Sequence, residues 1–280
     1  MFTTINNVIL QLTDPVLSWL LDLPSDVALI VVGVGTGALL TFARLLTTDQ
    51  DLLKRCDQDK RRLGQLIREA KGNQEKEAVR RFRATKGTIA MLTLRAEGRP
   101  LLLAILPIAL LGTWCFQRLE FHAPAAGQPV ALYAYFPVSA AGGLAHVVPQ
   151  DDVTAEDGWV QEILPVTDPA EGPPHAIATW HLQAAARAAP YTLQIRYRRG
   201  TYRKNLLVGQ RTYAPAVEFY TASTGGADEQ ITCAETRLEP VKLFGVVPGV
   251  PSLLLAPWLV AYFLIAVPSV SLIKRAFRIY

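Results

Sequence analysis

Few residues in this chain have the types and spacing that covalent chemistry or metal binding requires. Its four histidines, at 122, 146, 175 and 181, match no zinc-binding pattern, and no cysteine lies beside any of them. No Ser, Thr or Cys has a general base at a recognisable motif spacing. The sequence therefore predicts a protein that is not an enzyme, with no metal site and no cofactor.

A glycine-rich run, Gly33, Gly35 and Gly37, resembles a phosphate-binding loop only superficially. It lies inside an apolar segment and follows no strand, whereas phosphate-binding loops connect a strand to a helix. Small residues in an apolar helix favour close packing against another membrane helix. We therefore expect these glycines to serve helix packing.

A polar stripe on the same segment is more informative. Gly33, Gly37, Thr41, Arg44 and Thr48 recur at steps of four and three, so they share one side of a helix. In one interpretation, Arg44 extends toward the lipid headgroups at the end of the helix. In the other, Gly37, Thr41, Arg44 and Thr48 line a hydrated substrate groove, open to the cytoplasm, in which Arg44 attracts polar parts of a translocating chain. The residues leave both interpretations open.

Three long apolar segments must position these side chains. Hydrophobic residues make up 50% of the chain and concentrate in blocks, which argues against a soluble globular protein. Ala28 to Leu46 would be roughly 28 Å long as a helix, the thickness of a hydrocarbon core. Pro100 to Phe116 starts at a proline suited to a first helical turn, and Leu253 to Ile273 is apolar enough to insert despite its prolines. We expect three membrane-spanning helices.

Charge predicts the orientation of these spans. Many Lys and Arg residues lie between the first two apolar segments, and Lys274, Arg275 and Arg278 follow the third. Because such residues resist translocation, both regions should be cytoplasmic, with the N-terminus outside, in a multi-pass protein of the inner (plasma) membrane. The expected order is an interfacial amphipathic segment (1–24), a first span (25–47), a coiled-coil hairpin (48–99), a second span (100–118), an outer domain (119–249), a third span (250–274) and a cytoplasmic tail (275–280).

The segment 48–99 has the pattern of two antiparallel helices. Apolar positions from Leu52 to Ala70 follow alternating steps of four and three, with Asp59 the charged exception, and the stretch Lys71 to Asn73 ends the first helix. The basic surface is either a solvated face or a contact site for something acidic, such as ribosomal RNA or anionic lipid headgroups. The candidate contact residues are Lys60, Arg61, Arg62, Arg80, Arg81 and Arg83.

The segment 119–249 has short β-prone runs separated by Pro, Gly and Ala-rich turns. In the run Tyr191 to Tyr197, four apolar or aromatic side chains alternate with polar ones, so one face of this strand should be buried. Regularly spaced strands predict an all-β, sandwich-like domain with an immunoglobulin-like outline. The basic residues of 196–211, interleaved with tyrosines, form either a binding patch or a solvated strand face. Strands are expected at 128–136, 159–164, 177–182, 191–197, 204–208 and 216–220.

Several stretches of the helical part together resemble a known family. They are Leu46 to Gln50 entering the basic hairpin, Ile105 to Trp114, and Pro257 to Tyr262 continuing through Pro268 to Arg275. The chain is similar to three-span prokaryotic relatives of the third subunit of the endoplasmic-reticulum membrane protein complex, within the YidC/Oxa insertase superfamily. It departs from them in its large outer domain and in having Met91 as the one methionine of the hairpin.

This resemblance implies a membrane protein insertase or chaperone that needs no nucleotide. It implies that the hairpin contacts the ribosome or nascent membrane proteins, and that Arg44 matches the groove arginine of the first span. The competing hypothesis is a membrane-anchored scaffold whose outer β-domain binds an extracytoplasmic partner.

Overall fold

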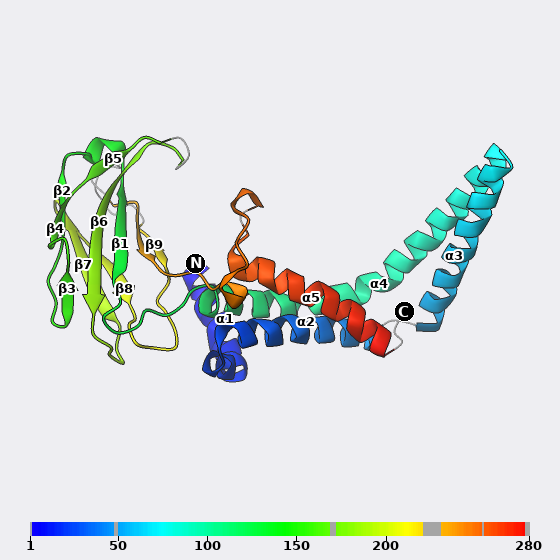
Figure 1. The fold of residues 1–280 in the computed structure, drawn as a ribbon, viewed down its shortest axis with the longest axis horizontal. Helices are drawn as coiled ribbons and strands as arrows, with labels where there is room; N and C mark the ends of the chain where they lie inside the picture. Colours follow the sequence, from blue (N-terminus) through cyan, green and yellow to red (C-terminus); the bar gives the residue numbers. More distant parts are fainter. Residues whose placement is uncertain (1, 48–49, 169–171, 221–230, 254, 278–280) are drawn as a thin grey trace. The chain divides into compact units, whose positions relative to one another are not determined.

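The fold was obtained as a computed structural model that describes residues 2–47, 50–168, 172–220, 231–253 and 255–277. It divides into two compact units (Figure 1). The helical unit comprises Met1–Phe116 and Lys242–Tyr280, and the β unit comprises Gln117–Val241. The segment after Val241 therefore groups with the helices, whereas the sequence placed the boundary at 249.

The helical unit begins with α1 (Phe2–Leu17) and the short 3-10 helix η1 (Ser18–Asp22), followed by α2 (Ser25–Thr47). Its last helix is α5 (Pro257–Ala276), with a proline in its first turn. Two helices are long and apolar enough to cross a membrane, over Ser25–Leu46 and Pro257–Ala276. A shorter apolar stretch, Leu102–Arg118, forms the end of another helix.

That helix is α4 (Lys76–Arg118), which is preceded by α3 (Gln50–Gly72). Figure 1 shows α3 and the first half of α4 side by side, and Gln74 takes a left-handed conformation in the turn between them. The prediction that a helix starts at Pro100 is wrong, because α4 continues through this position without a break. A proline within a helix removes one backbone hydrogen bond, and α4 remains helical on both sides of this position.

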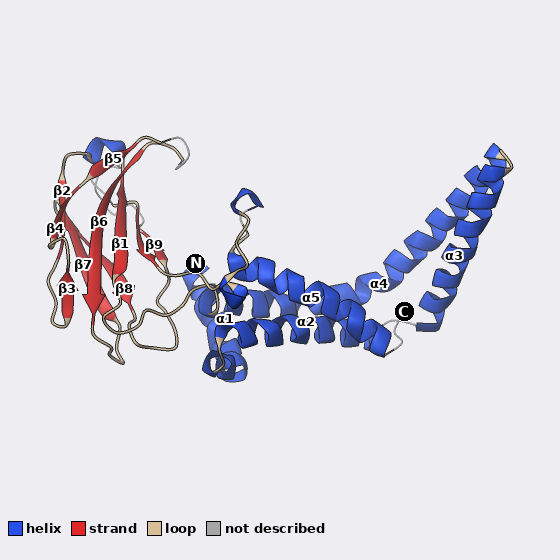
Figure 2. Ribbon diagram, in the orientation of Figure 1, coloured by secondary structure: helices blue, strands red, loops and turns tan. Residues whose placement is uncertain are grey.

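The β unit consists of two antiparallel sheets (Figure 2). One has the strand order β3-β6-β1-β10-β9, with β5 also paired to β6, and the other has the order β4-β2-β7-β8. Side chains from both sheets share one buried core, which gives the sandwich its two layers. The strands are β1 (Val130–Phe136), β2 (Leu144–Val147), β3 (Val153–Ala155), β4 (Val160–Glu162), β5 (Leu164–Val166), β6 (His175–Ala184), β7 (Tyr191–Tyr197), β8 (Gly200–Leu206), β9 (Val217–Phe219) and β10 (Cys233–Arg237).

Alternation of side chains identified β7 correctly. Tyr191, Leu193, Ile195 and Tyr197 are all buried in the core, as the sequence predicted. The prediction missed β2, β3 and β10, and it gave one strand at 159–164 where the structure has two, β4 and β5. These strands are short and present few large apolar side chains, so their burial depends on neighbouring strands rather than on their own pattern.

Candidate functional site

The polar stripe of α2 lies against α5 in a tight helix contact. A Cβ atom added at Gly33 would lie 2.8 Å from Cγ2 of Ile265, and one added at Gly37 would lie 3.0 Å from Cβ of Ser269. Thr41 is buried, and its hydroxyl donates a hydrogen bond of 2.7 Å to the carbonyl oxygen of Gly37. A side chain at Gly37 would crowd α5, so α2 and α5 are in close contact at this position.

The remaining predicted groove residues lie toward the end of α2. Arg44 belongs to its last turn and is partly buried. Thr48 lies outside the described residues. Gly37 and Thr41 therefore lie together in the packed part of α2, and Arg44 lies further along the helix, in its last turn.

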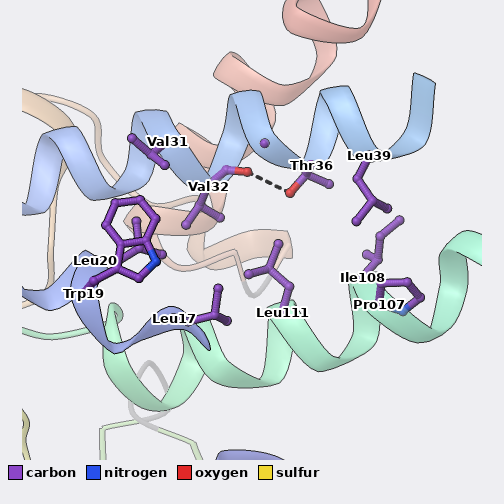
Figure 3. Close-up of a pocket in the computed structure, with 11 residues that line it drawn as sticks. Leu17, Trp19, Leu20, Val31, Val32, Thr36, Leu39, Pro107, Ile108 and Leu111 are labelled. Carbon is purple, nitrogen blue, oxygen red and sulfur yellow. Dashed lines mark hydrogen bonds between the residues drawn. The ribbon is translucent and has the colours of Figure 1, made fainter. Parts of the chain in front are cut away.

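A cavity of about 210 Å³ lies instead between α2, α4 and the α1–η1 segment (Figure 3). Nearly all of its lining side chains are apolar, so it suits a hydrocarbon surface and offers no acid or base for chemistry. The lining residues are Leu17, Trp19, Leu20, Val31, Val32, Gly35, Thr36, Leu39, Pro107, Ile108 and Leu111.

Two small residues of α2 shape this cavity. A Cβ atom at Gly35 would meet no other atom within 4 Å, in contrast to Gly33 and Gly37. Thr36 is buried, and its hydroxyl donates a 2.8 Å hydrogen bond to the carbonyl of Val32, as Figure 3 shows. Because this bond satisfies the hydroxyl proton within the helix, Thr36 adds little polarity to the cavity.

The α1–η1 segment forms one wall of the cavity and is linked to α4 by a polar contact. The indole Nε1 of Trp114 donates a hydrogen bond of 2.8 Å to Oδ1 of Asp14. Trp114 is fully buried, and its ring nitrogen needs a partner there. No motif in the sequence pointed to this pair, since its members are 100 positions apart.

The predicted basic contact residues fall into two groups along the α3–α4 hairpin. Arg61 and Arg62 are exposed and Lys60 is half-buried, on the middle of α3, where Arg61 forms a salt bridge of 3.0 Å with Asp57. The exposed residues Arg80, Arg81 and Arg83 lie near the start of α4.

At the end of the hairpin, a hollow of about 520 Å³ has an apolar floor and a largely basic rim. Arg80 and Arg83 contribute to it, together with Lys71 and Lys76, which the sequence prediction had not selected. Charge alone did not distinguish these lysines from the other basic residues of the hairpin.

In the β unit, the basic and aromatic residues of 196–211 do not form a common patch. Tyr197 is buried, and so is Lys204, which is fully enclosed and donates a hydrogen bond to the carbonyl of Pro215. Burial lowers the pKa of Lys204 from 10.5 to about 8, although Glu218 and Glu235 partly counter the effect. Alternation along the strands places Arg196 and Arg203 on the exposed face, opposite Tyr197 and Lys204, whereas Arg198 lies in the turn beside the Tyr197 ring.

The part of the chain that the structure describes contains no group of three or more His, Cys, Asp or Glu side chains able to hold a metal ion. Cys56 and Cys115 are buried and Cys233 is partly buried, each as a free thiol. No protein-family model, curated protein or solved structure matches the chain.

Proposed function

We propose that this protein is an insertase-like chaperone that helps short hydrophobic segments move from the cytoplasm into the bilayer. In this proposal α2, the apolar end of α4 and α5 span the inner membrane. The α3–α4 hairpin is a cytoplasmic coiled coil, and the β unit lies outside. No covalent step is involved, since clients are transferred between environments rather than modified.

One observation supports this function above the others: α4 is a single helix with two kinds of surface. Its first turns carry Arg80, Arg81 and Arg83, and its later turns supply Pro107, Ile108 and Leu111 to the apolar cavity. The two regions are roughly 36 Å apart along the helix. A client that meets the basic hairpin would therefore find an apolar receiving surface further along the same helix.

The cavity replaces the predicted stripe as the proposed client-binding surface. Hydrophobic side chains of a client would fill the space beside Gly35 and Thr36. Arg44, at the cytoplasmic end of α2 in this orientation, would attract acidic or polar parts of the client. Replacing Arg44 with Glu should slow insertion of acidic-tailed clients, whereas Arg44→Lys should retain it.

Filling the cavity tests this function. The full chain is reconstituted in liposomes, and insertion of a short-tailed single-span client is followed by protease protection. Gly35→Leu should reduce insertion to the level of empty liposomes, because Leu would occupy the open space. Val34→Leu is the matched control, since Val34 is exposed on the same helix. Normal insertion with Gly35→Leu would reject the cavity as the client site.

Orientation is tested separately in sealed cells. Protease added from outside should cleave the β unit and spare the α3–α4 hairpin. Cleavage of the hairpin with an intact β unit would reject the proposed topology.

The scaffold function has one observation in its favour. The edge strand β9 exposes Phe219 at 76% and Val217 at 39%, which suits addition of a strand from another protein. Crosslinking from Phe219 in cells would capture a partner at this edge. Such a partner, together with no insertion by wild-type protein, would favour the scaffold.

A further inference from the structure

The β7–β8 hairpin carries a concentration of positive charge that client insertion does not use. Residues 191–206 include five basic residues and no acidic residue. Lys204 is buried, but the four arginines are exposed. These arginines are Arg196, Arg198, Arg199 and Arg203.

The register brings these arginines close together. Tyr197 pairs with Gly200, so Arg198 and Arg199 form a two-residue turn between the strands. Arg196 pairs with Thr201 and Gln194 pairs with Arg203, which places both strand arginines within a few residues of the turn. The hairpin therefore presents four guanidinium groups at one end.

Arg198 takes an unusual backbone conformation in this turn. Arg198 has a φ of 50°, in the left-handed region, and a two-residue turn with positive φ at its first position favours glycine there. An L-residue in this conformation is strained. The chain nevertheless has arginine at this position, with its guanidinium carbon 5.3 Å from the centroid of the Tyr197 ring.

Protection of a sheet edge explains only part of this charge. Strand β8 is the edge of its sheet, and a charged residue such as Arg203 discourages pairing with other chains. Arg198 and Arg199 lie in the turn, beyond the paired residues of the ladder, so they do not protect the edge. Their charge calls for a different explanation.

We propose that the β7–β8 hairpin binds the phosphate groups of anionic phospholipids. Guanidinium groups form paired, charge-assisted hydrogen bonds with phosphate. Two long apolar helices belong to the same chain, so once they are inserted, tethering raises the effective concentration of headgroup phosphates around the β unit. This inference requires insertion of the helices in a bilayer but is independent of any client.

The charge predicts a measurable binding contribution. Each arginine near an anionic surface contributes roughly a fivefold increase in the binding equilibrium, so loss of two reduces binding about thirtyfold. Exposed charges are screened by salt, and binding should weaken as ionic strength rises.

Energy transfer in nanodiscs tests the proposal on the full chain. A donor dye is attached through Thr201→Cys in a chain that also carries Cys233→Ser, and the acceptor is a headgroup-labelled lipid. Nanodiscs contain phosphatidylcholine alone or with phosphatidylglycerol. Energy transfer should increase with phosphatidylglycerol and decrease at high salt.

Two variants and a control identify the residues responsible. Arg198→Gln with Arg199→Gln should reduce the binding equilibrium constant about thirtyfold. Arg198→Gly removes one charge and relieves the turn, so it should weaken binding about fivefold while the hairpin folds at least as well. Arg211→Gln changes the same charge at an exposed position outside the hairpin and should leave energy transfer unchanged.

Three results would overturn the proposal. The first is energy transfer in wild-type protein that does not depend on phosphatidylglycerol. The second is an equal loss with Arg211→Gln, which would indicate a general charge effect. The third is abolition of energy transfer by dilute inorganic phosphate, which would identify a site for free anions. None of these results would alter client insertion, so failure here is distinguishable from failure of the proposed function.

Discussion

One buried ammonium group, that of Lys204, should contribute a distinct part of the pH dependence of the stability of the β unit. Its side chain is fully enclosed, and burial lowers its pKa from 10.5 to about 8. Between these two values Lys204 binds more protons in the unfolded chain than in the folded one, so its contribution to stability rises with pH across this window, while the raised pKa of the Cys233 thiol opposes part of the rise. Below about pH 8 both states are protonated and the full cost of burying the charge is present.

The size of this effect follows from the shift in pKa. A difference of about 2.5 pH units corresponds to about 3 kcal/mol of destabilisation at neutral pH. Most of it, about 2.5 kcal/mol, should be recovered between about pH 7 and pH 10. Burial raises the pKa values of Tyr135, Tyr213 and Tyr220. Above about pH 10 these tyrosines lose protons more readily in the unfolded chain, which lowers stability, so the pH range in which stability rises ends there.

Replacement of Lys204 by Met isolates this contribution. The free energy of unfolding of the wild type, relative to that of Lys204→Met, should rise with pH. The variant also loses the hydrogen bond to Pro215, but this loss is the same at all pH values and does not change the slope. Urea unfolding of the full chain in detergent can be followed by fluorine NMR of fluorotryptophan at the buried Trp180. Arg203→Gln, an exposed neighbour, is the control. Parallel pH curves for wild type and Lys204→Met would refute the argument.

Three other outcomes follow from packing and backbone geometry. Gly37→Ala should destabilise the helical unit by about 1–3 kcal/mol because its methyl group meets α5, whereas Gly35→Ala should not, and thermal unfolding in detergent compares the two. Arg198→Gly should stabilise the β unit by about 1 kcal/mol, and an unchanged urea midpoint would argue against strain at this turn. Trp114→Phe leaves Asp14 without its indole donor, so amide exchange in α1 should accelerate; exchange at the wild-type rate would mean that this bond does not hold α1.

Local patterns determined much of this protein from sequence. Length and apolarity predicted α2 and α5, and alternation predicted the buried face of β7, because both depend only on residues a few positions apart. Close spacing of small residues likewise predicted that Gly33 and Gly37 pack against another helix, but the same prediction for Gly35 is wrong, because a Cβ atom there would meet no other atom within 4 Å. In each case the pattern that specifies the element is contained within the element.

Tertiary structure decided which side of α2 is open. The periodic stripe through Gly37 and Thr41 has the same spacing whether it lines a groove or contacts another helix, and only the position of α5 shows the contact. The cavity beside Gly35 forms where α2, α4 and the α1–η1 segment meet, and no single segment contains that information. Periodicity identifies the face of a helix, but the identity of its neighbour depends on the long-range packing of the folded chain.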